Sequence, residues 1–375
     1  MNRIIFLLFI YFLFSCSQKT SEKHETISTD SISSMQQAEK ISYPPLDTGV
    51  FFLKNKDIFR EIIELKGEHF IPADTFIFVP KECKMVVRKN RMIMKIFDYS
   101  KGAQPYLIFK YPEMEFIEKK GIMGNGPDEF LYADIIPTYD ESIFCYLFEL
   151  TNEKMYILDM QGNITPYPYK FNSSINYGIS QKRDIHNIGK DDFIYVDQSK
   201  TGKSIFRSHI ENDSIHTEEI ISLQLNPKRK SPFTYIGYFD INQEKNRMVY
   251  AYQYFKILKF MDMEGKTLRT LNFQQEEFDT NSLKIVNGLD QNVTHYWGIC
   301  GTKDFVYCVY FGSKPANIRK EKDDIYIEQY DWNGNPIRKY KLDTSWGYIY
   351  IDEEQNELLM VSIQDDDPFF RYKLL

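Results

Sequence analysis

The clearest copy of a repeating pattern reads Met155-Tyr156-Ile157-Leu158-Asp159-Met160-Gln161-Gly162, an apolar strand followed by Asp-x-x-Gly. A second apolar strand continues to Phe171. Aspartate accepts backbone hydrogen bonds in tight turns, and glycine adopts the positive φ that closes a hairpin. The pattern therefore predicts a β-hairpin.

Further copies of this hairpin follow along the chain. Complete copies occupy residues 258–265 and 327–334, a looser copy occupies 96–102, and a degenerate turn lies at 211–214. The five turn aspartates lie 61, 54, 49 and 69 positions apart: Asp98, Asp159, Asp213, Asp262 and Asp331. A period near fifty is typical of a propeller blade of four strands.

The two ends of the repeating region each lack part of a blade. Phe369–Leu374 is a third strand with no room for a fourth, and Phe59–Leu65 is an orphan strand at the start. If the N-terminal strand completes the C-terminal blade, no unpaired edge remains. We therefore predict an all-β fold over residues 46–375: a single six-bladed β-propeller with four antiparallel strands per blade, the last blade completed by the N-terminal strand.

The first sixteen residues resemble a bacterial lipoprotein signal peptide. Arg3 precedes the uncharged run Ile4–Phe14, which is too short to span a bilayer, and Ser15 precedes Cys16. Phe14 is bulkier than the usual residue at its place in a lipobox. The alternatives are an ordinary secretory signal and a chance cysteine. The preferred interpretation makes residues 1–16 signal and lipobox, with lipidation at Cys16 and the membrane as partner.

Residues 17–45 are rich in Ser, Thr, Glu, Lys and Gln and carry few large apolar side chains. Such a segment cannot bury enough apolar surface to offset its ordering entropy, so we predict a disordered tether. Ser17, which is not aspartate, resembles the residue after the cysteine in lipoproteins sent to the outer membrane. Which face of that membrane the body occupies stays open.

Charge and cysteine usage exclude some classes of function. The whole chain has a formal net charge of −7, and removal of Arg3 with the leader makes it −8. Nucleic-acid binding needs a basic footprint that this chain lacks. Cys83, Cys145, Cys300 and Cys308 lack CxxC spacing, so a zinc site is not predicted. A disulfide stays possible, but Cys145 and Cys308 lie in apolar strands and are interpreted as small buried hydrophobes.

A glycine-rich segment, Gly121–Phe130, follows the first hairpin and reads G-I-M-G-N-G-P-D-E-F. With the lipobox, the tether and the repeats, it resembles the six-bladed, TolB-like (NHL-related) propeller lipoproteins of Gram-negative bacteria. The resemblance covers essentially the whole chain and implies fold and envelope location rather than a reaction. From the residues alone, the segment is a connection between blades in which Asp128 and Glu129 cap amides. Direct ligand contact is the alternative.

Candidate ligand-binding residues fall in two groups. The first lies in this connection: Asn125, Asp128, Glu129 and Phe130. The second lies near the starts of innermost strands, which line the channel of a propeller: Arg183, Asp184, His186, His295, Trp297 and Trp346. Ordinary channel lining is the competing interpretation of the second group.

Motifs for catalysis and for metal binding are absent. HExxH, GxSxG, P-loop and Rossmann patterns do not occur, and Asp365-Asp366-Asp367 lacks EF-hand spacing and is interpreted as a solvated turn. We therefore predict no catalytic residue, no metal and no cofactor. The leading function is a binding or scaffold module, with a monomeric body, for an envelope protein, peptide or glycan. The alternative is an enzyme of hydrolase or lyase type that acts on an extracytoplasmic glycan or lactone-like substrate at the channel mouth.

Overall fold

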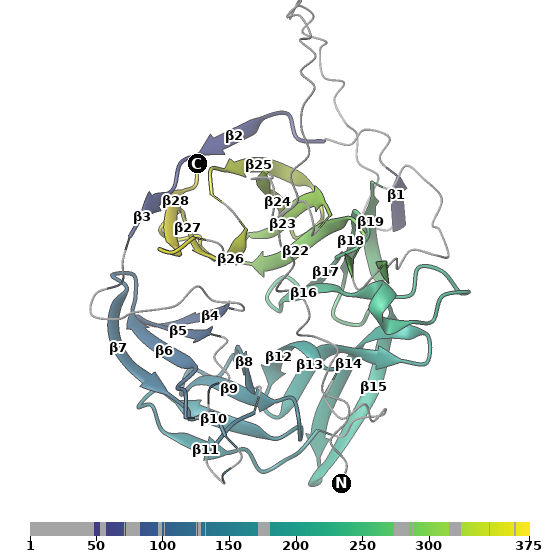
Figure 1. Cartoon of the computed structure of the whole chain (residues 1–375). Coiled ribbons are helices and arrows are strands. Elements are labelled where there is room, and N and C mark those ends of the chain that lie inside the picture. The colour runs from purple at the N-terminus through teal and green to yellow at the C-terminus, as the bar shows by residue number, and fades with distance from the viewer. Residues whose placement is uncertain are drawn as a thin grey trace, which may run out of the picture.

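Six sheets are arranged in a ring around a central axis in the computed structural model of the chain (Figure 1). In a propeller this axis is that of the central channel. The structure describes residues 49–52, 58–70, 72, 83–96, 100, 102–124, 126, 129–131, 133–171, 181–273, 285–286, 289–290, 292–314, 324–344, 346–363 and 365–375. Each sheet is one blade. Its innermost strand is the first of four consecutive strands, and three blades carry an additional or closing strand from the N-terminal region at the outer edge. The predicted six-bladed propeller is therefore confirmed.

Blades 1 to 3 are four-stranded antiparallel sheets. Blade 1 contains β4 (Cys83–Arg88), β5 (Arg91–Ile96), β6 (Tyr106–Lys110) and β7 (Glu115–Lys120). Blade 2 contains β8 (Ala133–Ile136), β9 (Ile143–Glu149), β10 (Met155–Asp159) and β11 (Ile164–Pro166). Blade 3 contains β12 (Arg183–Gly189), β13 (Asp192–Ser199), β14 (Gly202–Glu211) and β15 (Ser214–Ser222).

Blades 4 to 6 each include a strand from the N-terminal region. Blade 4 contains β16 (Gly237–Asn242), β17 (Arg247–Tyr252), β18 (Ile257–Met261), β19 (Thr267–Asn272) and β1 (Gly49–Phe52). Blade 5 contains β22 (Thr294–Gly301), β23 (Phe305–Ser313), β24 (Ile325–Asp331), β25 (Pro336–Leu342) and β2 (Ile62–Leu65). Blade 6 contains β26 (Gly347–Asp352), β27 (Glu357–Ser362), β28 (Phe369–Lys373) and β3 (Glu68–His69).

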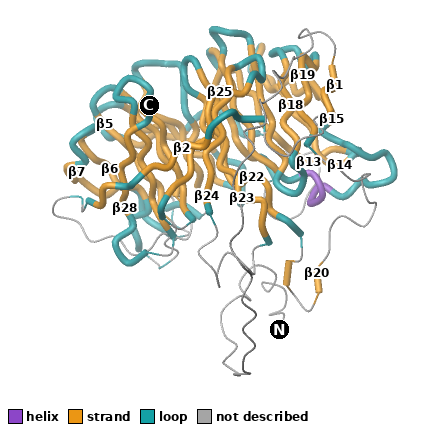
Figure 2. Tube along the Cα trace, turned by 90° about the horizontal axis from the view of Figure 1, so that it is seen from above, coloured by secondary structure: helices purple, strands orange, loops and turns teal. Residues whose placement is uncertain are grey.

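Two short elements lie in connections between blades. They are the 3-10 turn η2 (Pro232–Tyr235) and the pair β20 (Ile285–Val286) and β21 (Leu289–Asp290). Figure 2 shows η2 and β20 on the same side of the ring. In a four-stranded meander the blade-to-blade connections and the turns between second and third strands share one face. The remaining turns share the other face.

Burial follows the position of each strand in its blade. The second strand β9 is buried along almost its whole length, whereas the outer strand β7 alternates exposed and half-buried residues. A second strand is covered by neighbouring blades on both faces, which favours a continuous apolar run. Six apolar clusters result, one between each pair of neighbouring blades. The core is therefore a closed ring of layers.

The Asp-x-x-Gly turns have the predicted chemistry. Asp159 Oδ1 accepts the Gln161 and Asn163 backbone N–H groups, both at 2.8 Å, and Gly162 has φ of 89°. Asp331 repeats the arrangement with Asn333 and Asn335 at 2.9 and 2.8 Å. These turns join the third and fourth strands of their blades. The copy at 96–102 instead joins the second strand of blade 1 to the third, so it is not equivalent, and Asp98 lies outside the described residues.

The N-terminal strands wrap three blades, and the detail of closure differs from the sequence prediction. The strand that completes blade 6 is β3, antiparallel to β28, with His69 opposite Phe370. The segment expected to do this, Phe59–Leu65, contains β2, which pairs in parallel with β25 of blade 5. β1 pairs in parallel with β19 of blade 4. Closure by an N-terminal strand is confirmed, whereas its assignment to residues 59–65 was wrong.

The four cysteines of the body are free thiols. Cys83, Cys145 and Cys308 are buried in apolar clusters, and Cys300 is half-buried. Burial raises the pKa of the Cys300 thiol to about 12. The interpretation of Cys145 and Cys308 as small buried hydrophobes is confirmed.

Candidate functional site

Three innermost strands place an aspartate, followed by isoleucine, on the channel side of the ring. Asp134 lies on β8, Asp184 on β12 and Asp240 on β16. Asp184 Oδ2 accepts the Phe239 N–H of the next blade at 3.0 Å, and Asp240 Oδ2 accepts the Gly301 N–H at 2.6 Å. These carboxylates therefore link neighbouring innermost strands around the channel.

Asp134 has lysine partners rather than a neighbouring amide of the next blade. Its carboxylate lies 3.2 Å from Lys84 Nζ and 3.4 Å from Lys95 Nζ. Burial by itself would raise the pKa of Asp134, but the two ammonium groups outweigh burial and hold the pKa below its ordinary value. This ion pair ties blade 1 to blade 2 at the channel.

His186 and Asp240 meet where blades 3 and 4 join. His186 Nε2 lies 3.8 Å from Asp240 Oδ1. Burial raises the pKa of Asp240 to about 6, and burial together with Lys84 lowers the pKa of His186 to about 4. Burial also raises the pKa of Asp184. The channel therefore contains groups whose charged forms are disfavoured by burial.

The sequence placed Arg183, Asp184 and His186 on an innermost strand, and the structure confirms that placement on β12. The Arg183 guanidinium donates to the Lys182 carbonyl at 2.7 Å. Asp184 has φ of 48°, a left-handed conformation that is uncommon for a non-glycine residue. Their contact with a ligand stays a prediction.

The glycine-rich connection between blades 1 and 2 is held by Glu129. Glu129 Oε2 accepts the Gly126 N–H at 2.7 Å, and a Cβ on Gly124 would lie 1.8 Å from the same oxygen. Phe130 is 2% exposed, and its ring lies 4.8 Å, edge to face, from that of Tyr156. The capping expected of Glu129 is confirmed, and Phe130 packs in the core. Asn125 and Asp128 lie outside the described residues.

Two of the three predicted aromatic residues, Trp297 and Trp346, come together, whereas the ring of His295 stacks on Tyr310. His295 and Trp297 lie on β22, and Trp346 directly precedes β26, so all three lie near the starts of innermost strands. The rings of Trp297 and Trp346 are 4.4 Å apart between centroids, in an edge-to-face arrangement. The sequence therefore found one convergent group at this end of the channel.

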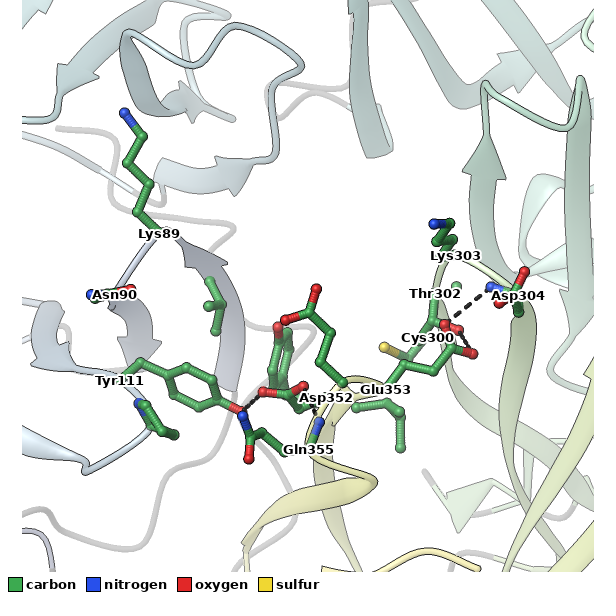
Figure 3. Close-up of a pocket in the computed structure, with 16 residues that line it drawn as sticks. Lys89, Asn90, Tyr111, Cys300, Thr302, Lys303, Asp304, Asp352, Glu353 and Gln355 are labelled. Carbon is green, nitrogen blue, oxygen red and sulfur yellow. Dashed lines mark hydrogen bonds between the residues drawn. The ribbon is translucent and has the colours of Figure 1, made fainter.

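A cavity of about 630 Å³ opens at the other end of the channel. Figure 3 shows Lys89, Asn90 and Tyr111 of blade 1 facing Thr302 and Lys303 of blade 5. The turn after β26 lies between them and supplies these labelled side chains: Asp352, Glu353 and Gln355. Val87, Pro112 and Ile351 add apolar surface. Four carboxylates and two lysines line it in all, which makes the cavity net acidic: Asp304, Asp352, Glu353, Glu354, Lys89 and Lys303.

Hydrogen bonds fix the acidic wall of this cavity. Tyr111 Oη donates to Asp352 Oδ2 at 2.7 Å, and Thr302 Oγ1 donates to Glu353 Oε1 at 2.7 Å. Burial, followed by the bond to Asp352, raises the pKa of Tyr111. The rings of Tyr111 and Tyr350 stand edge to face at 5.8 Å. Glu354 is exposed at the rim. The carboxylates of Asp352 and Glu353 are therefore oriented before any ligand binds, and the Asp304 carboxylate pairs with Lys245 at 3.0 Å.

Several residues of the site were not predicted from the sequence. Asp134 and Asp240 share the Asp-Ile pair with Asp184, at intervals of 50 and 56 positions, and that recurrence was a usable signal. The cavity residues come from turns of blades 1, 5 and 6, and no motif marks them.

Metal ligation is not indicated among the residues that the structure describes. No group of three or more His, Cys, Asp or Glu side chains in those ranges is arranged to hold an ion. Asp365, Asp366 and Asp367 lie in the turn between β27 and β28, as expected. Within the same ranges no helix has the length and apolar character needed to cross a bilayer.

The fold and the channel define a six-bladed β-propeller. The model of the TolB-like 6-blade propeller-like family matches residues 57–354, most of the chain, and the chain belongs to this family. The family resemblance inferred from the sequence is confirmed. No curated protein sequence matches the chain.

Solved structures that are similar to this chain have low sequence identity to it. A DUF4221-family protein from Bacteroides vulgatus is 12% identical, with a TM-score of 0.56 over 84% of this chain and 98% of that one. A candidate exported protein from Bacteroides fragilis is 9% identical, with a TM-score of 0.45 over 83% and 98%. Regucalcin, a calcium-binding protein from Agrobacterium tumefaciens, is 9% identical, with a TM-score of 0.45 over 84% and 95%. At 12% identity the likeness to the first of these structures concerns the fold alone.

Proposed function

We propose that this protein is a cell-envelope lipoprotein whose propeller binds a peptide segment with a basic side chain in the cavity between blades 5, 6 and 1. The observation that carries the proposal is the cavity itself. Its volume of about 630 Å³ lies within the usual range of ligand pockets, roughly 300–1,000 Å³. Turns of a rigid ring supply its walls, which suits a preorganised binding site.

The lining favours a cation. Four carboxylates face two lysines, and the rings of Tyr111 and Tyr350 stand in the wall. A lysine or arginine side chain combines an apolar stem with a charged head, and aromatic faces attract such heads. The protein's net charge of −7 also favours encounter with a basic partner. A basic peptide therefore forms more favourable contacts with the carboxylates and aromatic rings of the cavity than an acidic or neutral peptide.

The enzyme alternative receives less support. Asp184 and Asp240 are half-buried channel carboxylates with raised pKa, and both accept backbone N–H groups of the neighbouring blade. Those bonds give them a role in holding the ring. We therefore assign the channel carboxylates to stability and the cavity to binding.

Fluorescence anisotropy with labelled peptides tests the binding. The probes are oligopeptides of one length containing lysine, glutamate or only neutral residues, and the protein is the soluble body, residues 46–375. Glu354→Lys should weaken binding of the lysine peptide by about tenfold. Binding by this variant should also depend less on salt concentration than binding by the wild type. Glu244→Lys is the matched control, because Glu244 is an exposed residue in the β16–β17 turn on the same face. Equal weakening in both variants would show a net-charge effect and reject the cavity.

The envelope part of the proposal rests on the leader sequence and on family membership. Acylation at Cys16 would hold the body at a membrane, with the outer membrane as the expected location. Cys16→Ser should abolish metabolic labelling with an alkynyl fatty acid and move the protein from the membrane to the soluble fraction. Labelling that survives the substitution would reject Cys16 as the anchor.

A further inference from the structure

A second pocket lies beside the cavity, on the same face of the ring. Its volume is about 520 Å³, which is within the usual range of ligand sites. Lys89 and Asn90 line this pocket and also line the cavity, so the two sites are neighbours. We call it the basic pocket, and its lining consists of Lys89, Asn90, Arg91, Lys110, Ile117 and Met160.

Two segments of blade 1 form a ridge between the cavity and the basic pocket. Asn90 lies in the β4–β5 turn, and its carbonyl accepts the Tyr111 N–H at 2.9 Å. Lys110 lines the basic pocket, and the next residue, Tyr111, lines the cavity. Figure 3 shows the Lys89 side chain extending away from Asp352 of the acidic wall. The ridge is therefore tied by a backbone hydrogen bond, which fixes the spacing of the two sites.

The charge of the basic pocket is opposite to that of the cavity. Three of its six lining residues are cationic, and none of these described lining residues is acidic. Arg91 Nη1 donates to the Met160 carbonyl at 3.1 Å, which leaves other guanidinium N–H groups to donate to a ligand. Lys110 Nζ lies 3.5 Å from Glu113 and 3.7 Å from Glu115, in exposed ion pairs of a kind that contribute little to stability. The pocket therefore favours an anionic group.

A carboxylate side chain fits this lining. The planar guanidinium of arginine matches the two oxygens of a carboxylate, and a lysine adds a second charge-assisted hydrogen bond. Ile117 is 44% exposed, so the apolar stem of a glutamate has a surface to pack on. The ridge is about two strands wide, roughly 10 Å, and an extended peptide advances about 3.3 Å per residue. An acidic residue about three positions from a side chain in the cavity therefore reaches the basic pocket.

We propose that the basic pocket binds a carboxylate side chain of the same peptide whose lysine or arginine occupies the cavity. This inference rests on the proposed peptide binding and narrows the partner to a segment in which a basic and an acidic residue are about three positions apart. Opposite charges on the two sides of one ridge select both the spacing and the order of the two residues, because like charges in either site repel.

Fluorescence anisotropy with the protein lacking its leader, residues 17–375, tests the proposal. The probes are labelled peptides of one length with acetylated and amidated ends, so that only side chains carry charge. One peptide contains a lysine alone, and one contains a glutamate alone. Two contain a glutamate three positions before or after the lysine, and a fifth contains the two residues side by side. One of the two spaced peptides should bind about tenfold more tightly than the lysine peptide, and the adjacent pair should gain less than about threefold.

Lys110→Gln should remove most of the gain that the spaced glutamate gives, because Lys110 is exposed and lines the basic pocket. Lys154→Gln is the matched control with the same change of charge, because Lys154 is exposed before β10 on the opposite face, and it should keep the gain.

The outcomes separate this inference from the cavity proposal. A lysine peptide that does not bind rejects the cavity, and the inference with it. If the lysine peptide binds, three results reject the basic pocket alone. These are no gain from glutamate at either spaced position, an equal gain at the spaced and adjacent positions, and an equal gain in wild type and Lys110→Gln. Equal loss of the gain in Lys110→Gln and Lys154→Gln would show a net-charge effect and also reject the pocket.

Discussion

Blades 4 to 6 and blades 1 to 3 protect their outer edges in different ways. In blades 4 to 6 an N-terminal strand covers the edge: β1, β2 and β3. In blades 1 to 3 the edges are β7, β11 and β15, and none of these pairs with a further described strand. β7 is charged, β11 has three residues and ends in Pro166, and β15 carries Glu218 and Glu219. Charge, brevity and proline discourage edge pairing. The outer edges of blades 4 to 6 are thus covered by N-terminal strands, whereas charge, short length and proline protect the outer edges of blades 1 to 3.

Removal of the covering strands should have the largest effect. A chain that begins at residue 72 lacks β1, β2 and β3 and leaves blade 6 with three strands. We expect loss of the cooperative unfolding transition and aggregation, because an exposed apolar edge templates association. Denaturant unfolding followed by circular dichroism is the measurement. A chain that begins at residue 46 is the control and should unfold at the same midpoint as the full mature chain. A cooperative transition in the shorter chain would show that the covering strands are dispensable.

We call blades 4 to 6 the covered half and blades 1 to 3 the open half. Each half also contains a buried ion network, and breaking either network should cost about 3–5 kcal/mol. In the covered half, Glu328 is 0% exposed and lies 3.3 Å from Lys256 Nζ and 3.6 Å from Lys339 Nζ. In the open half, Lys182 Nζ lies 3.0 Å from Glu153 and 3.3 Å from Asp197.

Glu328→Gln and Lys182→Met should each lower the free energy of unfolding in urea by that amount, because each leaves two like charges buried. If one of the two variants lost less than about 1 kcal/mol of its free energy of unfolding, the ion network of that half would contribute little to stability, contrary to this prediction.

The His186–Asp240 contact joins the two halves. As the pH rises, these two side chains should change the free energy of unfolding in opposite directions. The folded pKa of Asp240 is raised to about 6, so its contribution to stability is lost as the pH rises from about 4 to 6. The folded pKa of His186 is lowered to about 4, so its contribution grows as the pH rises from about 4 to 6.5.

Relative to wild type, Asp240→Asn should gain up to about 3 kcal/mol between pH 4 and 7, and His186→Gln should lose a similar amount. Urea midpoints across this pH range measure both. Parallel pH profiles in the two variants would contradict the opposite signs.

Glycines at blade connections give the smallest expected effect. In the covered half, a Cβ on Gly347 would lie 2.4 Å from the Val361 carbonyl oxygen, which is fixed backbone. In the open half, a Cβ on Gly124 meets the Glu129 carboxylate, the movable end of a side chain.

Gly347→Ala should therefore cost about 2–3 kcal/mol and Gly124→Ala about 1 kcal/mol by thermal unfolding. Glu129→Ala in the Gly124→Ala background should recover part of that loss. Equal costs for the two glycine substitutions would show that the Glu129 carboxylate is as immovable as backbone.

The repeat made the propeller predictable, because each Asp-x-x-Gly turn is local chemistry that the sequence states directly. The assignment of Phe59–Leu65 failed for a nonlocal reason. An orphan apolar strand suits either the parallel edge of blade 5 or the open edge of blade 6, and pattern alone does not choose between them. The copy around Asp98 misled because a turn motif does not record which strands it joins.

The site was partly predictable for the same reasons. His295, Trp297 and Trp346 were found because each lies near the start of an innermost strand, a position that the blade period fixes. Tyr111 and Glu353 line the cavity from turns far apart in sequence, and only ring closure brings blades 1 and 6 together. No local sequence pattern indicates that these two residues are neighbours.

The pairing of β3 with β28 constrains the order of events during synthesis. His69 contacts the Asp367 carbonyl at 2.8 Å across 298 positions of the chain. Contacts of such separation form late, because loop closure must precede them. A nascent chain cannot complete its ring until its last residues have been made. The polypeptide therefore reaches its final architecture only after the strand that ends at Lys373 has been synthesised.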